Sequence, residues 1–175
     1  FFLNKSLAFD KDGKVNQWYY EMINLGFNYR ITDFQSALGI SQLKKVDRFI
    51  KERRKIAKLY NQGFSKNKFI TVPSESFDIT HAYHLYTILI DFKKLGKSRN
   101  QVMKKLRNFN IGTQVLYIPV HLQPYYSRKY GFKYGDYPSA EKYYESCLSI
   151  PMFQGLKEQE INKVIIKINQ IVSAN

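Results

Sequence analysis

The stretch TDFQSALGISQLKKVDRFIKERRKIAKLYNQG, residues 32–63, decides the fold. Its start has the form of a capping box, in which Thr32 and Gln35 each accept a hydrogen bond from the other residue's backbone N–H group. Gly63 is typical of a helix stop. Apolar residues recur near helical spacing, at Phe34, Leu38, Leu43, Val46, Ile50, Ile56 and Tyr60. The pattern predicts one helix of about 30 residues, roughly 45 Å long, which bridges two domains or a subunit interface.

Strand and helix patterns alternate after this helix. Buried strands are predicted at residues 83–90, 113–118 and 148–150. One helix is predicted from the capping box of Ser98 and Gln101, and another begins at Pro138. A terminal helix follows from an inner stripe of Ile161, Val164, Ile165, Ile168 and Ile171. The order predicts an α/β to α+β fold in which helices cover a small sheet.

The length of 175 residues suits one domain, or one and a part. We expect three divisions. Residues 1–31 form an irregular segment, residues 32–63 form the bridging helix, and residues 64–175 form a small C-terminal domain.

The net charge of +14 allows two interpretations. A polyanion partner such as a nucleic acid is one, and a lysine-rich composition spread over solvated faces is the other. No compact stretch is purely basic, because the densest run, residues 51–58, contains Glu52, Ile56 and Ala57. We therefore predict that these charges form the outward face of a helix, and that the protein has no nucleic-acid partner.

Other bulk features bear on location. The single cysteine, Cys147, excludes an internal disulfide and suits a reducing cytoplasm. No apolar run approaches the roughly 20 residues that cross a bilayer, so we expect no membrane partner. The first residues, Phe1 to Lys5, contain no signal-peptide pattern and no initiator Met, and we expect the natural start to lie upstream.

Two segments carry candidate binding residues. Asn28 and Arg30 precede the capped helix, where an amide and a guanidinium suit a bound phosphate. A turn-forming Asn and an ordinary ion pair are the more common alternative for such a segment. His121 lies in an aromatic-rich loop between Pro119 and Pro124, where it either contacts a ligand or bonds to local backbone.

Several chemistries lack support in the residues. His81 and His84 stand three residues apart with no Cys or carboxylate pair to complete a metal site, so none is expected. There is no glycine-rich phosphate loop and no nucleophile–histidine–acid order.

Eight blocks of the sequence, taken in order, resemble a known family. They are 18–22 (WYYEM), 25–39 (LGFNYRITDFQSALG), 41–43 (SQL), 81–86 (HAYHLY), 112–115 (GTQV), 117–126 (YIPVHLQPYY), 135–144 (GDYPSAEKYY) and 148–151 (LSIP). The chain resembles the DegT/DnrJ/EryC1/StrS sugar aminotransferases over nearly its whole length. Within that family it resembles members that aminate a UDP-linked 4-keto-6-deoxy-N-acetylhexosamine on the way to pseudaminic acid.

The resemblance implies the C-terminal part of an aspartate-aminotransferase-like enzyme of pyridoxal phosphate fold type I. It implies a homodimer with shared active sites, pyridoxal phosphate as cofactor, and glutamate as amino donor. The Schiff-base lysine of the family belongs to the large N-terminal domain, and no lysine here stands in its context. We therefore expect no catalytic residue in this chain and no activity from the chain alone.

The resemblance also assigns residues. Residues 1–31 would end the large domain and carry active-site loops, with Asn28 and Arg30 binding the cofactor and Asn28 reaching the phosphate of the opposite subunit. The sugar-nucleotide pocket would be lined by Trp18, Tyr19, Tyr117 and His121.

Leu116 departs from the family pattern, because close relatives usually have His at this position. The sugar, the aminated carbon and the donor therefore stay open, and another nucleotide keto sugar is the first alternative. A basic nucleic-acid-binding module and a cofactor-free assembly module are the others.

Overall fold

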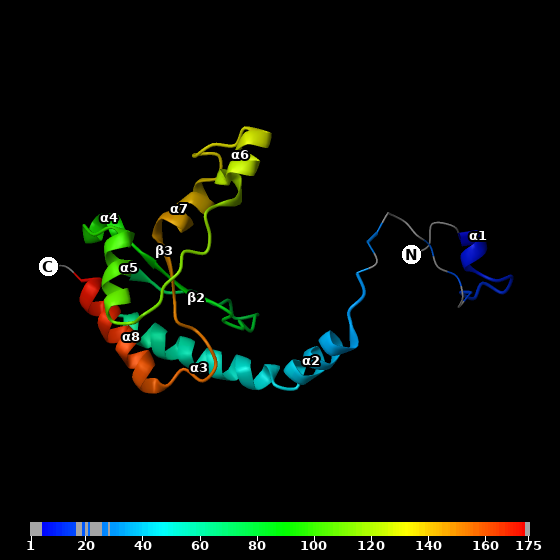
Figure 1. Ribbon diagram of the computed structural model, residues 1–175, viewed down its shortest axis with the longest axis horizontal. Coiled ribbons are helices and arrows are strands. Elements are labelled where there is room, and N and C mark those ends of the chain that lie inside the picture. Colours follow the sequence, from blue (N-terminus) through cyan, green and yellow to red (C-terminus); the bar gives the residue numbers. More distant parts are fainter. Residues whose placement is uncertain (1–4, 17–18, 20, 22–25, 28, 174–175) are drawn as a thin grey trace. The chain divides into compact units, whose positions relative to one another are not determined.

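The structure is a computed structural model that describes residues 5–16, 19, 21, 26–27 and 29–173. The chain divides into two compact units, residues 1–43 and residues 44–175 (Figure 1). The domain boundaries given above stay a prediction.

The first unit contains α1 (Lys5–Ala8) and α2 (Asp33–Leu43). The capping box before α2 is confirmed, since the Thr32 N–H donates to Gln35 Oε1 at 2.8 Å and the Gln35 N–H donates to Thr32 Oγ1 at 3.4 Å. No residue of α2 is buried. Its apolar side chains Phe34, Leu38, Ile40 and Leu43 are all exposed.

The predicted single helix over residues 32–63 is wrong, because the structure has two helices there. α2 ends at Leu43, Lys44 and Lys45 form a turn, and α3 runs over Val46–Phe64. Helices in proteins are stabilised mainly by tertiary packing of an apolar face, and only α3 has buried residues. The shared apolar spacing therefore did not require one continuous helix.

The second unit contains a three-stranded antiparallel sheet in the order β1-β2-β3. Its strands are β1 (Ile70–Thr71), β2 (Tyr86–Ile90) and β3 (Cys147–Ile150). Ile88 stands opposite Leu148, and Ile70 stands opposite Ile90.

Two strand predictions need correction. The strand predicted over residues 113–118 is reduced to one bridge between Gln114 and Ser149. The strand predicted from Tyr83 begins instead at Tyr86. Tyr83 has a φ of 47°, outside the extended range, and its N–H donates to His81 Nδ1 at 2.8 Å.

Helices cover the sheet and extend beyond it (Figure 1). They are α3, α4 (Phe92–Leu95), α5 (Arg99–Asn108), α6 (Pro124–Tyr130), α7 (Pro138–Ser146) and α8 (Glu158–Ile171), with a 3-10 turn, η1, at Val120–Leu122. The Ser98–Gln101 capping box is confirmed. The predicted stripe of α8 is also confirmed in that Ile161, Val164, Ile168 and Ile171 are buried.

The core of the second unit lies between α3, the sheet and α8. Ile56, Ala57, Tyr60 and Phe64 form the buried face of α3. The rings of Tyr60 and Tyr86 lie 5.0 Å apart, and both side chains are fully buried. Each large apolar side chain buried in this way stabilises the fold by about 1.5–3 kcal/mol.

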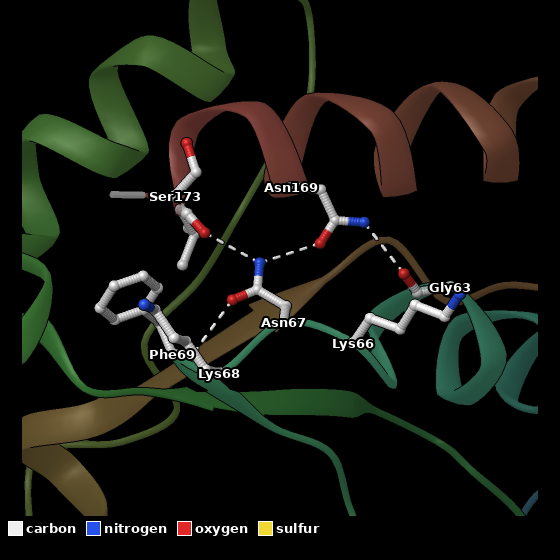
Figure 2. Close-up of a pocket in the computed structure, with 8 residues that line it drawn as sticks. Gly63, Lys66, Asn67, Lys68, Phe69, Asn169 and Ser173 are labelled. Carbon is white, nitrogen blue, oxygen red and sulfur yellow. Dashed lines mark hydrogen bonds between the residues drawn. The ribbon is translucent and has the colours of Figure 1, made fainter. Parts of the chain in front are cut away.

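Side-chain amides fix the end of α3 to α8 (Figure 2). Asn67 Nδ2 donates to Asn169 Oδ1 at 2.9 Å and to the Val172 carbonyl at 2.8 Å. Asn169 Nδ2 donates to the Gly63 carbonyl at 2.9 Å. These residues border a pocket of about 320 Å³. Because the amide groups of Asn67 and Asn169 bond to each other, we interpret the pocket as part of the structural contact between the end of α3 and α8.

Gly63 lies inside α3, where it allows α8 to approach closely. The prediction that Gly63 ends the helix is wrong, because α3 continues to Phe64. A Cβ atom added at Gly63 would stand 2.7 Å from two carbon atoms of the Ile165 side chain. Ile165 is β-branched and has little rotamer freedom in a helix, so it cannot easily move away.

We predict that Gly63→Ala lowers the melting temperature of the full-length protein. Overpacking costs about 1–3 kcal/mol, which exceeds the roughly 1 kcal/mol that alanine contributes in a helix. Gly39→Ala is the matched control, because Gly39 is also helical and has no neighbouring atom within 4 Å. Thermal unfolding of both variants is the measurement. Equal stability of the two variants would show that α8 does not approach α3 at this point.

Candidate functional site

An aromatic cleft with a volume of about 570 Å³ opens between η1, α6 and α7. Its lining is Pro119, Val120, His121, Tyr126, Tyr130, Phe132, Tyr137 and Ala140. In Figure 1, α6 and α7 lie at the end of the second unit away from α8. Pockets that bind small molecules are commonly apolar with few polar groups. In this lining, His121 is the residue with a basic side chain.

Prolines and a glycine shape the walls of the cleft. Pro124 and Pro138 each stand in the first turn of a helix, α6 and α7, where a missing N–H costs nothing. Gly131 ends α6 with a φ of 74°, a conformation that other residues adopt at a cost. The chain therefore turns on both sides of α6, and Tyr126 and Tyr130 of α6 line the same cleft as His121 and Tyr137.

His121, in the cleft wall, forms a buried pair with Glu141, which does not belong to the lining. His121 Nε2 lies 2.8 Å from Glu141 Oε1, and the two residues are 7% and 3% exposed. The Gly135 N–H donates to both carboxylate oxygens at 2.9 Å, and the Tyr137 N–H donates to Oε1 at 3.3 Å. Burial by itself would raise the pKa of Glu141, but these hydrogen bonds, led by that of His121, outweigh it and lower the pKa.

The predicted site residues are placed as follows. His121 lines the cleft, whereas Tyr117 on the same loop is 71% exposed and does not belong to the cleft lining. The Tyr19 hydroxyl donates to Glu21 at 2.7 Å, and this bond raises the pKa of Tyr19. Arg30 is exposed in the segment before α2. Trp18 and Asn28 lie outside the described residues.

Two arginines of α3 hold the neighbouring loops. Arg53 Nη1 donates to the carbonyls of Tyr83 at 2.9 Å, His84 at 2.8 Å and Met152 at 3.2 Å. Arg54 pairs with Glu75, and the hydrogen bond from Arg54 lowers the pKa of Glu75. The prediction that the charges of residues 51–58 all form an outward face is therefore wrong for these two arginines.

The role of Glu141 could not be predicted from the sequence. The residue stands in the first turn of α7, after Pro138, and its partner His121 lies 20 residues earlier. An acidic residue in the first turn of a helix is common, because it interacts favourably with the helix dipole. Because this pattern is common, it does not indicate the pairing of Glu141 with His121, which is seen only in the folded chain.

We predict that the stability contributed by Glu141 depends on pH. A carboxyl whose folded-state pKa is lowered stabilises the fold above its ordinary pKa of 4.5 and loses that contribution as pH falls through the folded pKa. The melting temperature of Glu141→Gln should therefore lie below that of the wild type at pH 7, and the difference should shrink below about pH 4.5.

The control for this prediction is Glu145→Gln, which removes an exposed carboxylate from the same helix. It should change the melting temperature little at neutral pH. A difference between wild type and Glu141→Gln that stays constant from pH 7 to pH 3, or grows, would contradict the lowered pKa.

Comparisons with known proteins agree with the fold. The model of the DegT/DnrJ/EryC1/StrS aminotransferase family matches residues 3–169. The uncharacterized protein MJ1066 of Methanocaldococcus jannaschii is 38% identical over 168 residues, which cover 96% of this chain and 44% of MJ1066. The spore coat polysaccharide biosynthesis protein SpsC of Bacillus subtilis is 36% identical, over 94% of this chain and 43% of SpsC.

A solved structure gives the same result. Helicobacter pylori PseC, an aminotransferase involved in the biosynthesis of pseudoaminic acid, superposes with a TM-score of 0.77 at 25% identity, over 96% of this chain and 44% of PseC. The chain thus spans less than half the length of these relatives. It has the architecture of part of a fold type I enzyme, as expected, and it belongs to the DegT/DnrJ/EryC1/StrS aminotransferase family, whose members depend on pyridoxal phosphate.

Proposed function

We propose that the whole protein transfers an amino group from glutamate to a UDP-linked 4-keto-6-deoxy-N-acetylhexosamine for a pseudaminic acid-type cell-surface sugar. This chain would be the C-terminal part of the enzyme and would supply a wall of the substrate site. Pyridoxal phosphate, when bound, would supply the chemistry for moving the amino group from the donor to the keto sugar. The residues of this chain would bind and orient the sugar nucleotide.

The aromatic cleft is the observation that carries this proposal. Tyr126, Tyr130 and Tyr137 give it flat apolar walls, and His121 gives it one polar group. Aromatic faces pack well against sugars and bases, while a single polar group can fix the orientation of a ligand. The loop of His121 is also the block that resembles the substrate loop of the family. SpsC and PseC are both named for the synthesis of sugar products, which supports the same substrate class.

The residues before α2 fit a cofactor phosphate by their chemistry. Arg30 is an exposed guanidinium two residues before Thr32, which caps an 11-residue helix. Helix N-termini and guanidinium groups both favour phosphate. Asn28 would add a neutral amide from the same segment and would reach the cofactor of the second subunit. The lysine that holds the cofactor would come from another part of the protein.

Another nucleotide keto sugar is the second candidate. Leu116 stands where close relatives usually carry His, and the neighbouring Tyr117 is exposed. A leucine side chain can neither donate nor accept a hydrogen bond, so if the His of the relatives bonds to the sugar, that bond is absent here. The identity of the sugar can therefore differ from that of the relatives.

A nucleic-acid partner finds less support. Arg53 and Arg54, in the densest basic run, bond to loop carbonyls and to Glu75.

Among the described residues, no helix has the length and apolar character to cross a membrane.

We predict that the full-length protein with pyridoxal phosphate and glutamate aminates UDP-linked 4-keto-6-deoxy-N-acetylhexosamine in preference to other nucleotide keto sugars. Competition assays with several such sugars are the measurement. Tyr126→Ala should raise KM roughly two- to twelvefold, because a lost aromatic contact costs about 0.5–1.5 kcal/mol.

Tyr143→Ala is the matched control for the substrate assay, since Tyr143 is an exposed residue of α7 outside the cleft. Its KM should match that of the wild type. Preference for a different keto sugar would support the second candidate. Absence of transfer to every nucleotide sugar would overturn the proposed function.

We also predict that Asn28→Ala in the full-length protein weakens retention of the cofactor by roughly ten- to a hundredfold. A hydrogen bond to a charged phosphate contributes about 1.5–3 kcal/mol. The melting temperature of the apo-protein should stay unchanged. Mixing this variant with one that lacks the cofactor lysine should restore activity, since one site of each heterodimer is then intact. Unchanged cofactor affinity would instead identify Asn28 as a turn residue.

A further inference from the structure

The Glu141 carboxylate is surrounded by donors that hold it as an acceptor. The Gly135 N–H bonds to both of its oxygens, and the Tyr137 N–H bonds to Oε1. A backbone N–H can only donate, so each oxygen must present a lone pair to it. These bonds lower the pKa of the carboxyl despite its burial, and at neutral pH it is ionised.

An ionised carboxylate determines which nitrogen of His121 carries the proton. Glu141 Oε1 has no proton to give, so the contact of 2.8 Å requires His121 Nε2–H to donate. In a neutral imidazole with a protonated Nε2, Nδ1 is an acceptor. Glu141 therefore selects one tautomer of the ring.

The second nitrogen of His121, Nδ1, has no hydrogen-bond partner in the described part of the chain and is not fully buried. No buried side-chain nitrogen or oxygen of those residues lacks a partner, so Nδ1 is not enclosed. The ring lines the cleft, and it packs against Tyr137 with 4.7 Å between the ring centroids, which fixes its orientation.

The surroundings of His121 contain few other titratable groups. Glu141 and Tyr137 face it from α7 and its start, and Tyr126 and Tyr130 line the cleft from α6. No Lys, Arg, Asp or Glu belongs to the cleft lining. A ligand group that meets Nδ1 of the neutral ring thus encounters an acceptor in an apolar wall, which suits a hydroxyl or an amide N–H.

We propose that Glu141 is a positioning residue: it holds His121 as the Nε2–H tautomer, so that Nδ1 accepts a hydrogen bond from a hydroxyl or amide N–H of the nucleotide sugar. This inference rests on the proposed function for the identity of the ligand. The role of Glu141 toward His121 does not depend on it.

The test combines a spectroscopic readout with matched variants of the full-length protein labelled with ¹⁵N-histidine. His121→Gln assigns the signals of the ring. The spectrum of the wild type at neutral pH should show a protonated Nε2 and an unprotonated Nδ1. Glu141→Met fills similar space without an acceptor and should yield a mixture of tautomers. Glu141→Gln keeps an acceptor oxygen for Nε2–H and should restore the wild-type tautomer.

Kinetics separate the positioning role from a structural one. His121→Gln can still donate to Glu141, but it lacks an acceptor at the place of Nδ1. Its KM for the nucleotide sugar should rise roughly two- to twelvefold, with a melting temperature near that of the wild type. Glu141→Met should raise KM in the same way, and Glu141→Gln should recover most of the loss, although both variants are less stable than the wild type.

Four results would contradict the inference in whole or in part. A wild-type ring protonated on Nδ1, or a tautomer unchanged in Glu141→Met, would overturn the role of Glu141. UDP-N-acetylglucosamine that binds, as seen by its phosphorus signals, while the Nδ1 resonance stays unmoved would overturn the acceptor role alone. Absence of binding by any nucleotide sugar would overturn the proposed function and with it the ligand, and the tautomer would still decide the role of Glu141.

Discussion

Burial of one face of α3 is the constraint on which the second unit depends. Tyr60 and Phe64 of that face pack with β2 and α8 in the core. The same helix carries Arg53, whose guanidinium binds three loop carbonyls from two distant parts of the chain. Hydrogen bonds to a charged donor are worth about 1.5–3 kcal/mol, so Arg53 orders the loops before β2 and after β3. One helix thus sets both the core and the loops at the start of β2 and the end of β3.

β3 connects this core to the cleft. It follows α7 directly, and all four of its residues are buried. Since α7 carries Glu141, the position of the carboxylate depends on the sheet. Arg99 strengthens this connection, because its guanidinium bonds to the Tyr144 carbonyl at the end of α7 and lies 4.8 Å from the Tyr144 ring centroid. The cleft therefore rests on regular structure although its lining comes largely from loops and short helices.

The features predicted correctly from the sequence are local ones. The capping boxes at Thr32 and Ser98 involve residues three apart, and the stripe of α8 repeats within one helix. The break at Lys44 was missed because apolar spacing continues across it, while burial begins only in α3. Gly63 was misinterpreted because its reason, the side chain of Ile165, lies about a hundred residues later in the chain.

The candidate site likewise contains residues that could be predicted from the sequence and residues that could not. His121 could be selected from its loop, since prolines and aromatic residues surround it in the sequence. Glu141 could not, because its pairing depends on how α7 returns to η1. The inward direction of Arg53 depends likewise on contacts with Met152 and Gln154, 99 and 101 residues away. The charge pattern of a sequence predicts the solvated faces of helices well, but it does not show which arginine side chain forms hydrogen bonds to a loop.

The central claim is that the aromatic cleft beside His121 holds the sugar nucleotide. A crystal structure of the full-length protein with a bound UDP-sugar tests it most directly. The account predicts that the ligand lies against Tyr126 and Tyr137, with a hydroxyl or amide group within hydrogen-bond distance of His121 Nδ1. A bound UDP-sugar that lies elsewhere and leaves this cleft unfilled would contradict the account.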